Sequence, residues 1–500
     1  MPLGRNLAAG LASSIWIAII GLAVVPLYLK YLGVEAYGLI GFFATTQAMF
    51  QLLDLGLAQT VNREISRYSA QAKWLEVRNL LHTLAVIYWI MGVSIAVVVF
   101  GLAPSIAGHW IEAEQLSPQT LERAVQLMGV VIACRWPIGL YQGALNGLER
   151  IATTSAINAV MMTLGSVGAV VVLAFVSASI EAFFMWQACV GIASALTMRL
   201  FAWRAIQFPG ASRFDSGELR RIWRFTTGVG VLALSGVVLT QLDKLLLSKL
   251  LNLSDFGHYM LATVIANGLY LLINPLFNVI YPRFSTLVAM GQEAELRMLY
   301  RLGTRMFVTM LFPIALMVAV FARELAYVWT RDEAIAHSVA PLLSFLSLGT
   351  ALHGVMYVPY ALQLAYGLPR LALKINLVLL CLLVPLTFFL ASHFGAIGGA
   401  LSWFVLHLVY VLLGSWLTHR ELLVGIGGPW LLRDVAVPLV SSAAVFLAVY
   451  YVVMRIEPGV AVSLLFAVFA ALLSILLSVA MSPQSYKLVV GVLGFRKRAA

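Results

Sequence analysis

Charged and strongly polar side chains recur at helical spacing inside segments that are otherwise apolar. Arg135 is followed by Gln142 and Asn146 at i+7 and i+11, so the three share one face of a helix. A guanidinium keeps its charge, and a charge at the centre of a bilayer costs about 2.5–3.5 kcal/mol even on insertion scales. We therefore interpret Arg135 as a cavity-facing residue that attracts an anion, with a structural ion pair as the alternative.

Three further apolar segments carry a polar face of the same kind. These faces consist of Gln47, Gln51 and Asp54; of His353, Tyr357 and Tyr360; and of Asn267, Asn274, Asn278 and Tyr281. We interpret Asp54 as a residue of the cavity or of ion coupling, and His353 as a ligand, a proton relay or a hydrogen-bonded packing residue. For the Asn, Gln and Tyr side chains, hydrogen bonding between helices is as good an interpretation as contact with a substrate.

Asp243 and Lys244 form the remaining charged pair inside an apolar segment. Neighbouring residues point about 100° apart on a helix, so we do not expect the two charges simply to neutralise each other. Lys244 lies toward the end of its segment, where its side chain is expected to reach the membrane interface. Because Thr240, Lys244 and Ser248 share a face, the pattern favours a transport pathway.

The segments that carry these residues are long and apolar enough to cross a membrane. Hydrophobic residues make up 62% of the chain and charged residues 11%, whereas soluble proteins are about one quarter charged. Apolar runs of about 20 residues predict fourteen spans. They lie near 9–32, 37–60, 79–101, 122–147, 154–177, 180–203, 223–250, 256–281, 300–321, 335–365, 371–390, 396–418, 434–454 and 460–481. The predicted fold class is an all-α polytopic membrane protein.

The chain repeats itself with a period of about 219 residues. Tyr37-Gly38 recurs as Phe256-Gly257, Arg63-Glu64-Ile65-Ser66 as Pro282-Arg283-Phe284-Ser285, and Gly147-Leu148-Glu149-Arg150 as Gly367-Leu368-Pro369-Arg370. Six spans separate the copies, so the two six-helix lobes keep the same orientation and are related by pseudo-two-fold symmetry. Such lobes suit alternating access around a hydrated cavity.

This repeat predicts the domain organisation. We expect an N-lobe in 1–205, a cytoplasmic linker with an amphipathic helix in 206–224, a C-lobe in 225–420, and two further spans with a basic cytoplasmic tail in 421–500. Most of the 32 Lys and Arg residues fall on one side of the predicted spans. By the positive-inside rule that side is cytoplasmic and holds both termini. The net charge of +11 is then mainly a signal of topology and of contact with anionic lipid head groups.

Several function classes lack the sequence features that they need. No segment outside the predicted spans exceeds about 26 residues, and none can bury a core of its own. The chain has no phosphate-binding Gly-rich loop ending in Gly-Lys-Ser/Thr, and its three cysteines lie singly. We therefore expect no enzyme activity, no cofactor, no metal site and no nucleic-acid partner.

Segments at the starts of the two lobes resemble Wzx-type polysaccharide flippases. They are Asn6, Pro26, Leu32-Gly33-Val34-Glu35-Ala36-Tyr37-Gly38, Leu53-Asp54-Leu55-Gly56-Leu57, Arg63, Gln241-Leu242-Asp243, Phe256-Gly257-His258-Tyr259 and Pro282-Arg283-Phe284-Ser285. The family belongs to the multidrug/oligosaccharidyl-lipid/polysaccharide exporter superfamily. The resemblance implies transfer of an undecaprenyl-pyrophosphate-linked oligosaccharide from the cytoplasmic to the periplasmic leaflet of a bacterial inner membrane. It also implies a cationic lumen and, in some members, coupling to a proton or sodium gradient.

The polar residues fit such a substrate. A diphosphate needs a positive, hydrated cavity, which Arg135 and Lys244 would supply, and sugars need polar and aromatic side chains such as Trp136. The expected partners are the lipid-linked glycan, membrane lipids and polysaccharide polymerase machinery. The alternatives are a multidrug or small-solute antiporter, a peptidoglycan-precursor flippase, and a membrane glycan polymerase or ligase. Arg135 argues against export of cations, and the longest predicted periplasmic loop, 101–122, is short for a catalytic domain.

Overall fold

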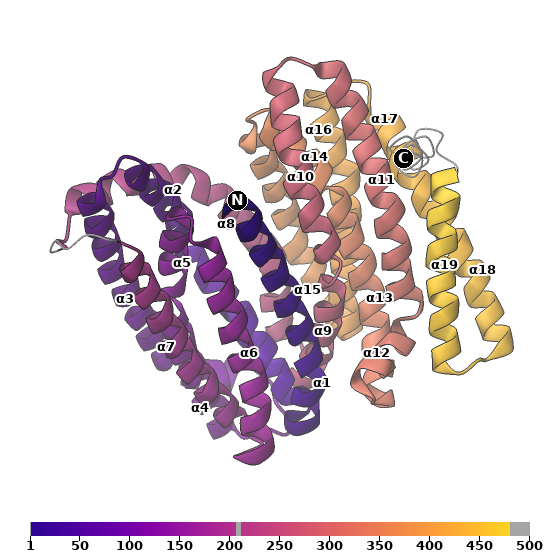
Figure 1. Ribbon diagram of the computed structural model, residues 1–500. Helices are drawn as coiled ribbons and strands as arrows, with labels where there is room; N and C mark the ends of the chain where they lie inside the picture. Colours follow the sequence, from indigo (N-terminus) through magenta and orange to yellow (C-terminus); the bar gives the residue numbers. More distant parts are fainter. Residues whose placement is uncertain (1, 207–211, 481–500) are drawn as a thin grey trace, which may run out of the picture. The chain divides into compact units, whose positions relative to one another are not determined.

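The structure is a computed structural model that describes residues 2–206 and 212–480. Helices account for all the regular secondary structure in this part of the chain, which confirms the predicted all-α class. The chain divides into two compact units, Met1–Gly257 and His258–Ala500, and the division falls inside helix α9 (Leu253–Asn267). Each unit is described by itself (Figure 1).

The N-terminal unit is a bundle of long helices, drawn from indigo to magenta in Figure 1. Its elements before α9 are α1 (Pro2–Phe50), η1 (Gln51–Asp54), α2 (Leu57–Ala70), α3 (Trp74–Ser105), η2 (Ile106–Trp110), α4 (Pro118–Arg135), α5 (Ile138–Gly147), α6 (Ile151–Phe175), α7 (Ile180–Ala205) and α8 (Ser216–Leu250). Helix α1 packs on α6, α3 on α4, α4 on α7 and α2 on α5. The buried faces are apolar, as expected where each helix presents a stripe to its neighbours.

The C-terminal unit repeats this plan and adds a helical hairpin. Its elements are α10 (Tyr270–Ala289), α11 (Glu293–Val320), α12 (Ala322–Thr330), α13 (Glu333–Val355), α14 (Tyr357–Ala365), α15 (Pro369–Val409), η3 (Tyr410–Gly414), α16 (Ser415–Glu421), α17 (Gly427–Pro429), η4 (Trp430–Ala436), α18 (Val437–Ile456) and α19 (Val460–Ala480). Helices α11 and α13, α13 and α15, and α10 and α14 pack in pairs. They correspond to the pairs α3–α4, α4–α7 and α2–α5 of the N-terminal unit.

The sequence repeat is visible in where the helices break. Helix α5 begins at Ile138 and α14 begins at Tyr357, which are separated by the same 219 residues. In both units the helix before the break ends two or three residues earlier. A proline lies at each break, Pro137 before α5 and Pro359 in the first turn of α14, and its missing N–H interrupts the helical hydrogen bonds. The two copies therefore fold alike locally as well as in their packing.

Two repeat-related glycines of the N-terminal unit lie against each other. A Cβ atom at Gly38 would lie 2.2 Å from the carbonyl oxygen of Leu253, and one at Gly257 would lie 2.4 Å from that of Val34. Val34 and Leu253 are themselves one repeat period apart, so the contact is reciprocal. Only glycine permits a backbone approach this close. The Tyr37-Gly38 and Phe256-Gly257 signature thus marks a tight contact between α1 and the first turn of α9.

A buried carboxylate joins the C-terminal hairpin to the rest of its unit. Asp434 of η4 has no exposed surface, and it accepts hydrogen bonds from Arg301 at 2.6 and 3.2 Å. Arg305 also pairs with it, donating through Nε at 3.1 Å. Trp430, also of η4, is buried, and its indole N–H donates to the Thr304 hydroxyl at 3.0 Å. Helices α18 and α19 then pack on α11 through an apolar cluster that includes Phe446.

The helices are compatible with fourteen membrane spans. By length and composition, ten stretches of the described chain can cross a membrane, or eleven when the bent pair α9–α10 counts as one span. Two of the ten are double-length, because α1 continues through a kink at Gly33 and α15 through one at Gly395, both with positive φ. Helix α8, with 35 residues, is long enough for a further span. The chain is therefore a multi-pass membrane protein.

Two predictions of domain organisation, the linker helix and the lobe limits, fall partly on residues outside the described part of the chain or differ from the structure. The expected amphipathic linker helix begins at Ser216 but is the first part of α8, which runs without a break to Leu250. Residues 207–211, the side chains of 218–233 and the basic tail after 480 lie outside the described part. The unit boundary at Gly257 comes after α8, whereas the sequence placed the second lobe from residue 225. The lobe limits stay a prediction.

Candidate functional site

Arg135 lies at the break between α4 and α5 rather than in the middle of one helix. It is the last residue of α4, and Trp136 and Pro137 separate it from α5. Because Pro137 has no N–H, the carbonyl of Ala133 lacks its usual helical donor. Gly92 of α3 packs against this carbonyl, where a Cβ atom would lie 3.0 Å from the oxygen. The break therefore fixes the backbone that carries the guanidinium.

The Arg135 guanidinium is held by neutral groups. It donates to Gln47 at 3.1 Å and to Gln187 of α7 at 2.6 Å, and it lies over the ring of Phe43 at 5.6 Å from the centroid. Within residues 2–206 and 212–480, no carboxylate forms an ion pair with it. The structural ion pair that was the alternative interpretation is thus not formed in this part of the chain. Two amides and a ring orient a positive charge but leave it uncompensated.

A polar cavity of about 450 Å³ opens beside Arg135 within the N-terminal unit. Its polar lining side chains are Gln47, Gln51, Asp54, Gln59, Arg135, Trp136 and Gln142. These come from α1, η1, α2 and the α4–α5 break, so the helix interruptions all converge on this space. Four of the predicted pathway residues therefore line one cavity: Arg135, Asp54, Gln51 and Gln142.

Arg135 also lines a second cavity, of about 430 Å³. It is enclosed by α1, α6 and α7 and the α4–α5 break, and its lining is mostly apolar. The apolar members include Ile17, Val24, Phe43, Met161, Met162 and Phe183, and the polar ones include Tyr28, Asn158, Ser166 and Gln187. Arg135 and Ile138 line both cavities. The guanidinium thus borders both a cavity with many polar side chains in its lining and a cavity with fewer of them.

Asp54 is placed by a helix break that the sequence did not predict. The expected continuous span over 37–60 is wrong, because the chain leaves the helix at Leu55 and Gly56, both with positive φ. Asp54 instead caps the N-terminus of α2, accepting from the backbone N–H of Ala58 at 3.2 Å, and it also accepts from the Tyr88 hydroxyl. A carboxylate is favourable at a helix N-terminus. Asp54 still lines the polar cavity with Gln47 and Gln51.

The predicted polar face of Arg135, Gln142 and Asn146 is only partly brought together. Gln142 lines the polar cavity with Arg135. Asn146 is not among its lining residues, and the buried Oδ1 atom of Asn146 has no hydrogen-bond partner in the described chain. Gln142 and Asn146 lie one turn apart on the same helix α5, so the cavity ends before it reaches Asn146.

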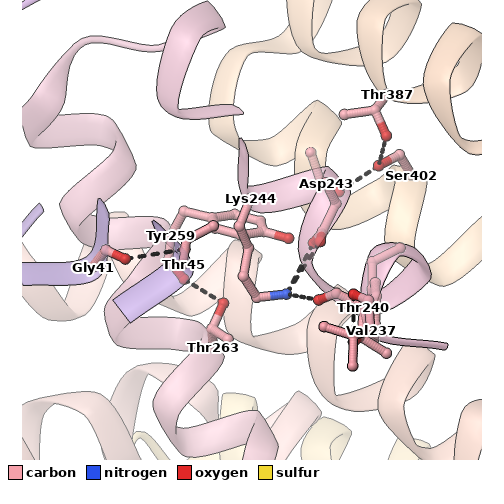
Figure 2. A network of polar contacts seen from close by, with 12 residues as sticks. Gly41, Thr45, Val237, Thr240, Asp243, Lys244, Tyr259, Thr263, Thr387 and Ser402 are labelled. Atoms are coloured by element: carbon pink, nitrogen blue, oxygen red, sulfur yellow. Dashed lines mark hydrogen bonds and ion pairs between the residues drawn. The ribbon is translucent and has the colours of Figure 1, made fainter. Parts of the chain in front are cut away.

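Asp243 and Lys244 pair with each other, which corrects the sequence expectation. Figure 2 shows the Lys244 ammonium reaching back to the Asp243 carboxylate, with Nζ at 3.2 Å from each oxygen, and to the Thr240 carbonyl at 2.8 Å. The long lysine stem overcomes the 100° angle between neighbours. Lys244 is 7% exposed and Asp243 is fully buried, so Lys244 does not extend to the interface. The pair contributes little net charge to a pathway.

His353 belongs to an aromatic cluster inside the C-terminal unit. Its Nδ1 is 2.6 Å from the Tyr270 hydroxyl, and its ring lies 4.6 Å from that of His407 and 5.4 Å from that of Tyr357, between centroids. Trp403 and Tyr410 complete the cluster, with Trp403 4.2 Å from His407. His353 and Tyr357, two residues of the predicted face, are thus in ring contact, whereas the third, Tyr360, stacks on Phe277.

The predicted asparagine face lies apart from this cluster. Asn274 and Asn278 are exposed on α10, and neither forms a hydrogen bond with a described residue. Phe277, on the same helix, stacks on Tyr281 and Tyr360. The two amides therefore present an unoccupied polar surface of the C-terminal unit.

Sequence reasoning missed two residues that complete these groups. Gln187 and His407 lie in apolar stretches and lack an Asn, Gln, Tyr or charged companion at i+4 or i+7 of the kind that marked the predicted faces. Their isolation inside a span was the available signal, because a lone polar side chain in a membrane helix needs a partner. Each supplies a contact that the predicted residue could not obtain from its own helix.

Comparison with known proteins places the chain in a family. No curated protein matches it. The family model described as polysaccharide biosynthesis protein matches residues 3–288, which is more than half of the chain. The chain belongs to this polysaccharide biosynthesis protein family.

Solved structures share the fold of this family member at low identity. The lipid II flippase MurJ, in an inward closed conformation, has a TM-score of 0.69 at 12% identity, and the match covers 96% of this chain and 98% of MurJ. An inward-facing MATE multidrug resistance transporter has a TM-score of 0.64 at 14% identity, covering 82% and 96%. A variant of the Vibrio cholerae MATE transporter VcmN reaches 0.58 at 16%, covering 84% and 96%. The chain therefore has the MATE and MurJ fold.

Proposed function

We propose that this protein moves an undecaprenyl-pyrophosphate-linked oligosaccharide from the cytoplasmic to the periplasmic leaflet of the bacterial inner membrane, by alternating access, for synthesis of a surface polysaccharide. Membership of the polysaccharide biosynthesis family supports the pathway, and the MurJ-like and MATE-like fold supports transport. Both termini would then be cytoplasmic, as the basic residues predict. Polymerase machinery at the periplasmic face would take up the product.

The observation that carries the proposal is the uncompensated charge of Arg135, which borders two cavities with different linings. A pyrophosphate is dianionic or more, and a guanidinium binds phosphate oxygens with two parallel hydrogen bonds. The polar cavity offers amides and Trp136 for sugar hydroxyls and ring faces. The second cavity, with its mostly apolar lining, suits hydrocarbon near the pyrophosphate. A lipid whose pyrophosphate joins a sugar to a hydrocarbon chain would place its sugar, its phosphates and its chain against these three groups of residues.

Binding of undecaprenyl pyrophosphate to the purified protein in nanodiscs tests this assignment. Replacement of Arg135 by Ala removes charge-assisted hydrogen bonds of about 1.5–3 kcal/mol, which corresponds to about 10- to 100-fold weaker binding. Uncharged undecaprenol should bind the wild type and Arg135→Ala equally. Arg199→Ala is the matched control, since Arg199 is an exposed arginine on α7 of the same unit. Unchanged undecaprenyl pyrophosphate affinity in Arg135→Ala would contradict the proposal.

One observation favours a second candidate, a small-cation antiporter of the same fold. Asp54 lines the polar cavity together with Arg135, and a carboxylate there suits an organic cation. Under this alternative, Asp54→Asn would abolish binding of a lipophilic cation such as tetraphenylphosphonium, while Arg135→Ala would leave it intact or stronger. The hydrogen bonds from Tyr88 and Ala58 already satisfy Asp54, so we favour the anionic cargo.

A further inference from the structure

The two histidines of the C-terminal unit lie where both carrier helices become irregular. His353 is the third-last residue of α13, just before the break that leads into α14. His407 comes near the end of α15, immediately before the π-helical segment Tyr410–Gly414. Irregular turns inside membrane helices are frequent at functional sites, because their backbone changes conformation at low cost. The pair thus lies beside two helix irregularities of this unit.

At the 219-residue offset of the repeat, Arg135 corresponds to Gly354, and His353 is the residue just before it. Arg135 ends α4 before its break, and His353 lies at the end of α13 before the equivalent break. The N-terminal unit therefore carries a permanent cation at this point. The C-terminal unit carries an imidazole, which becomes a cation only when it binds a proton. The equivalent helix ends therefore carry a permanent cation in one copy and a titratable ring in the other.

The hydrogen bonds of His407 define where a proton would bind. Its Nδ1 is 2.8 Å from the carbonyl oxygen of Trp403, one helical turn earlier. A carbonyl only accepts, so Nδ1 carries the hydrogen and Nε2 is the basic nitrogen of the neutral ring. The side chain is 1% exposed, and its ring faces that of His353 at 4.6 Å between centroids. A proton taken up by one imidazole raises the cost of a second, so the pair titrates as a unit.

The groups that surround the pair are mostly neutral and aromatic. Tyr270 of α10, Tyr357 of α14 and Tyr410 of η3 are the titratable side chains in ring or hydrogen-bond contact with His353. From α11, the apolar Leu311 packs against Gly354, next to His353. No Asp, Glu, Lys or Arg among the described residues contacts His353. Protonation would therefore place an unpaired charge in an apolar environment, which disfavours the charged ring in this conformation.

We propose that His353 and His407 together form a proton-binding site, and that one proton bound there is exchanged for each cargo molecule. The proton adds to a ring nitrogen of the pair when the unit is open to the periplasm and leaves from it when the unit is open to the cytoplasm. This inference rests on the proposed flippase function, since the proton replaces the lipid-linked glycan in the return step. It assigns coupling to the histidine pair rather than to Asp54, which serves as a helix cap.

Proton binding can be measured without cargo through the fluorescence of Trp403. Its indole lies 4.2 Å from His407, and an imidazolium at that distance quenches indole emission. The difference spectrum between the wild type and Trp403→Phe isolates this indole. We expect its emission to fall in one step as the pH is lowered from 8 to 3 in nanodiscs. The His353→Asn, His407→Asn double variant should lose the step, because a carboxamide keeps the hydrogen bonds but binds no proton.

The matched control is His393→Asn. His393 lies on the same helix, and its Nδ1 is 2.8 Å from the carbonyl oxygen of Phe389, also one turn earlier, but its ring is exposed. This variant should keep the Trp403 step unchanged. A wild-type Trp403 emission that is constant over the range, or a step that persists in the His353→Asn, His407→Asn double variant, would overturn the proton site.

Coupling is tested in proteoliposomes with a fluorescent undecaprenyl-pyrophosphate trisaccharide. With one proton exchanged per molecule, a gradient of one pH unit shifts the final leaflet ratio of the lipid by up to about tenfold. The double variant should flip the lipid but reach the same ratio with and without the gradient. Gradient-driven accumulation in the double variant, or a wild-type ratio that ignores the gradient, would refute the coupling. If the wild type flips nothing at any pH, the proposed function itself fails, while the Trp403 titration still decides the proton site.

Discussion

At the scale of single residues, the sequence predicted which side chains matter better than it predicted what they contact. Periodicity reports which face of one helix a residue occupies, so Gln142 was expected beside Arg135, and both line one cavity, whereas Asn146 does not line it. It says nothing about a neighbouring helix that is distant in sequence, and Gln187 was missed for that reason. Lys244 shows a different limit, because the flexibility of a long side chain outweighs the direction of its Cα–Cβ bond.

Asp54 gives a prediction at this scale. Its replacement by Ala removes the acceptor for the Ala58 N–H and should lower the free energy of unfolding by about 0.5–2 kcal/mol, as for other helix N-caps. Asp54→Asn keeps a side-chain oxygen and should lose less than Asp54→Ala. Thermal unfolding in detergent, followed by circular dichroism, gives both values. Equal unfolding temperatures for the wild type and Asp54→Ala would show that the cap has no role in stability.

At the scale of helices, the repeated residues marked positions of backbone constraint, whereas hydropathy did not predict where the helices break. Hydropathy predicted an unbroken span over 37–60 and another over 256–281. The structure has η1 and Gly56 in the first, and a bend of 43° between α9 and α10 in the second. Such breaks keep the average apolar character of a span, so a sliding window does not register them. The repeated Gly and Pro positions did mark structural constraints, because backbone geometry depends on individual residues.

The reciprocal contact of Gly38 and Gly257 gives a prediction for the helices. A methyl group at either position would meet a backbone carbonyl of the other helix at less than 2.5 Å, so the helices must separate. We expect Gly257→Ala to cost about 1–3 kcal/mol of unfolding free energy, as overpacking does. The unfolding temperature in detergent, measured by differential scanning fluorimetry, reports this loss.

Gly101→Ala is the control for that measurement. Gly101 lies in α3, and a Cβ atom there meets nothing within 4 Å. Alanine is the better helix former, so this variant should be as stable as the wild type or up to about 1 kcal/mol more stable. If Gly257→Ala proved as stable as Gly101→Ala, the tight contact between α1 and α9 would not exist in the folded protein.

At the scale of the whole molecule, composition and span count were sufficient to predict the fold class. Apolar runs predicted a multi-pass helical protein, the resemblance predicted the superfamily fold, and the helices are compatible with the fourteen expected spans. The identity of the cargo could not follow in the same way, because many cargoes share this fold. It depends on a few side chains, above all on the uncompensated Arg135.

Flipping of a lipid-linked glycan by the purified protein is the most direct test of the central claim. Proteoliposomes would carry undecaprenyl pyrophosphate linked to a dithionite-sensitive fluorescent trisaccharide, and the labelled lipid accessible from outside would be followed over time. We predict that the wild type and Arg199→Ala equilibrate the lipid between leaflets, whereas Arg135→Ala is slower by about 10- to 100-fold, the factor expected for loss of a charge-assisted hydrogen bond. Equal rates in empty liposomes and in liposomes with the wild-type protein would contradict the account.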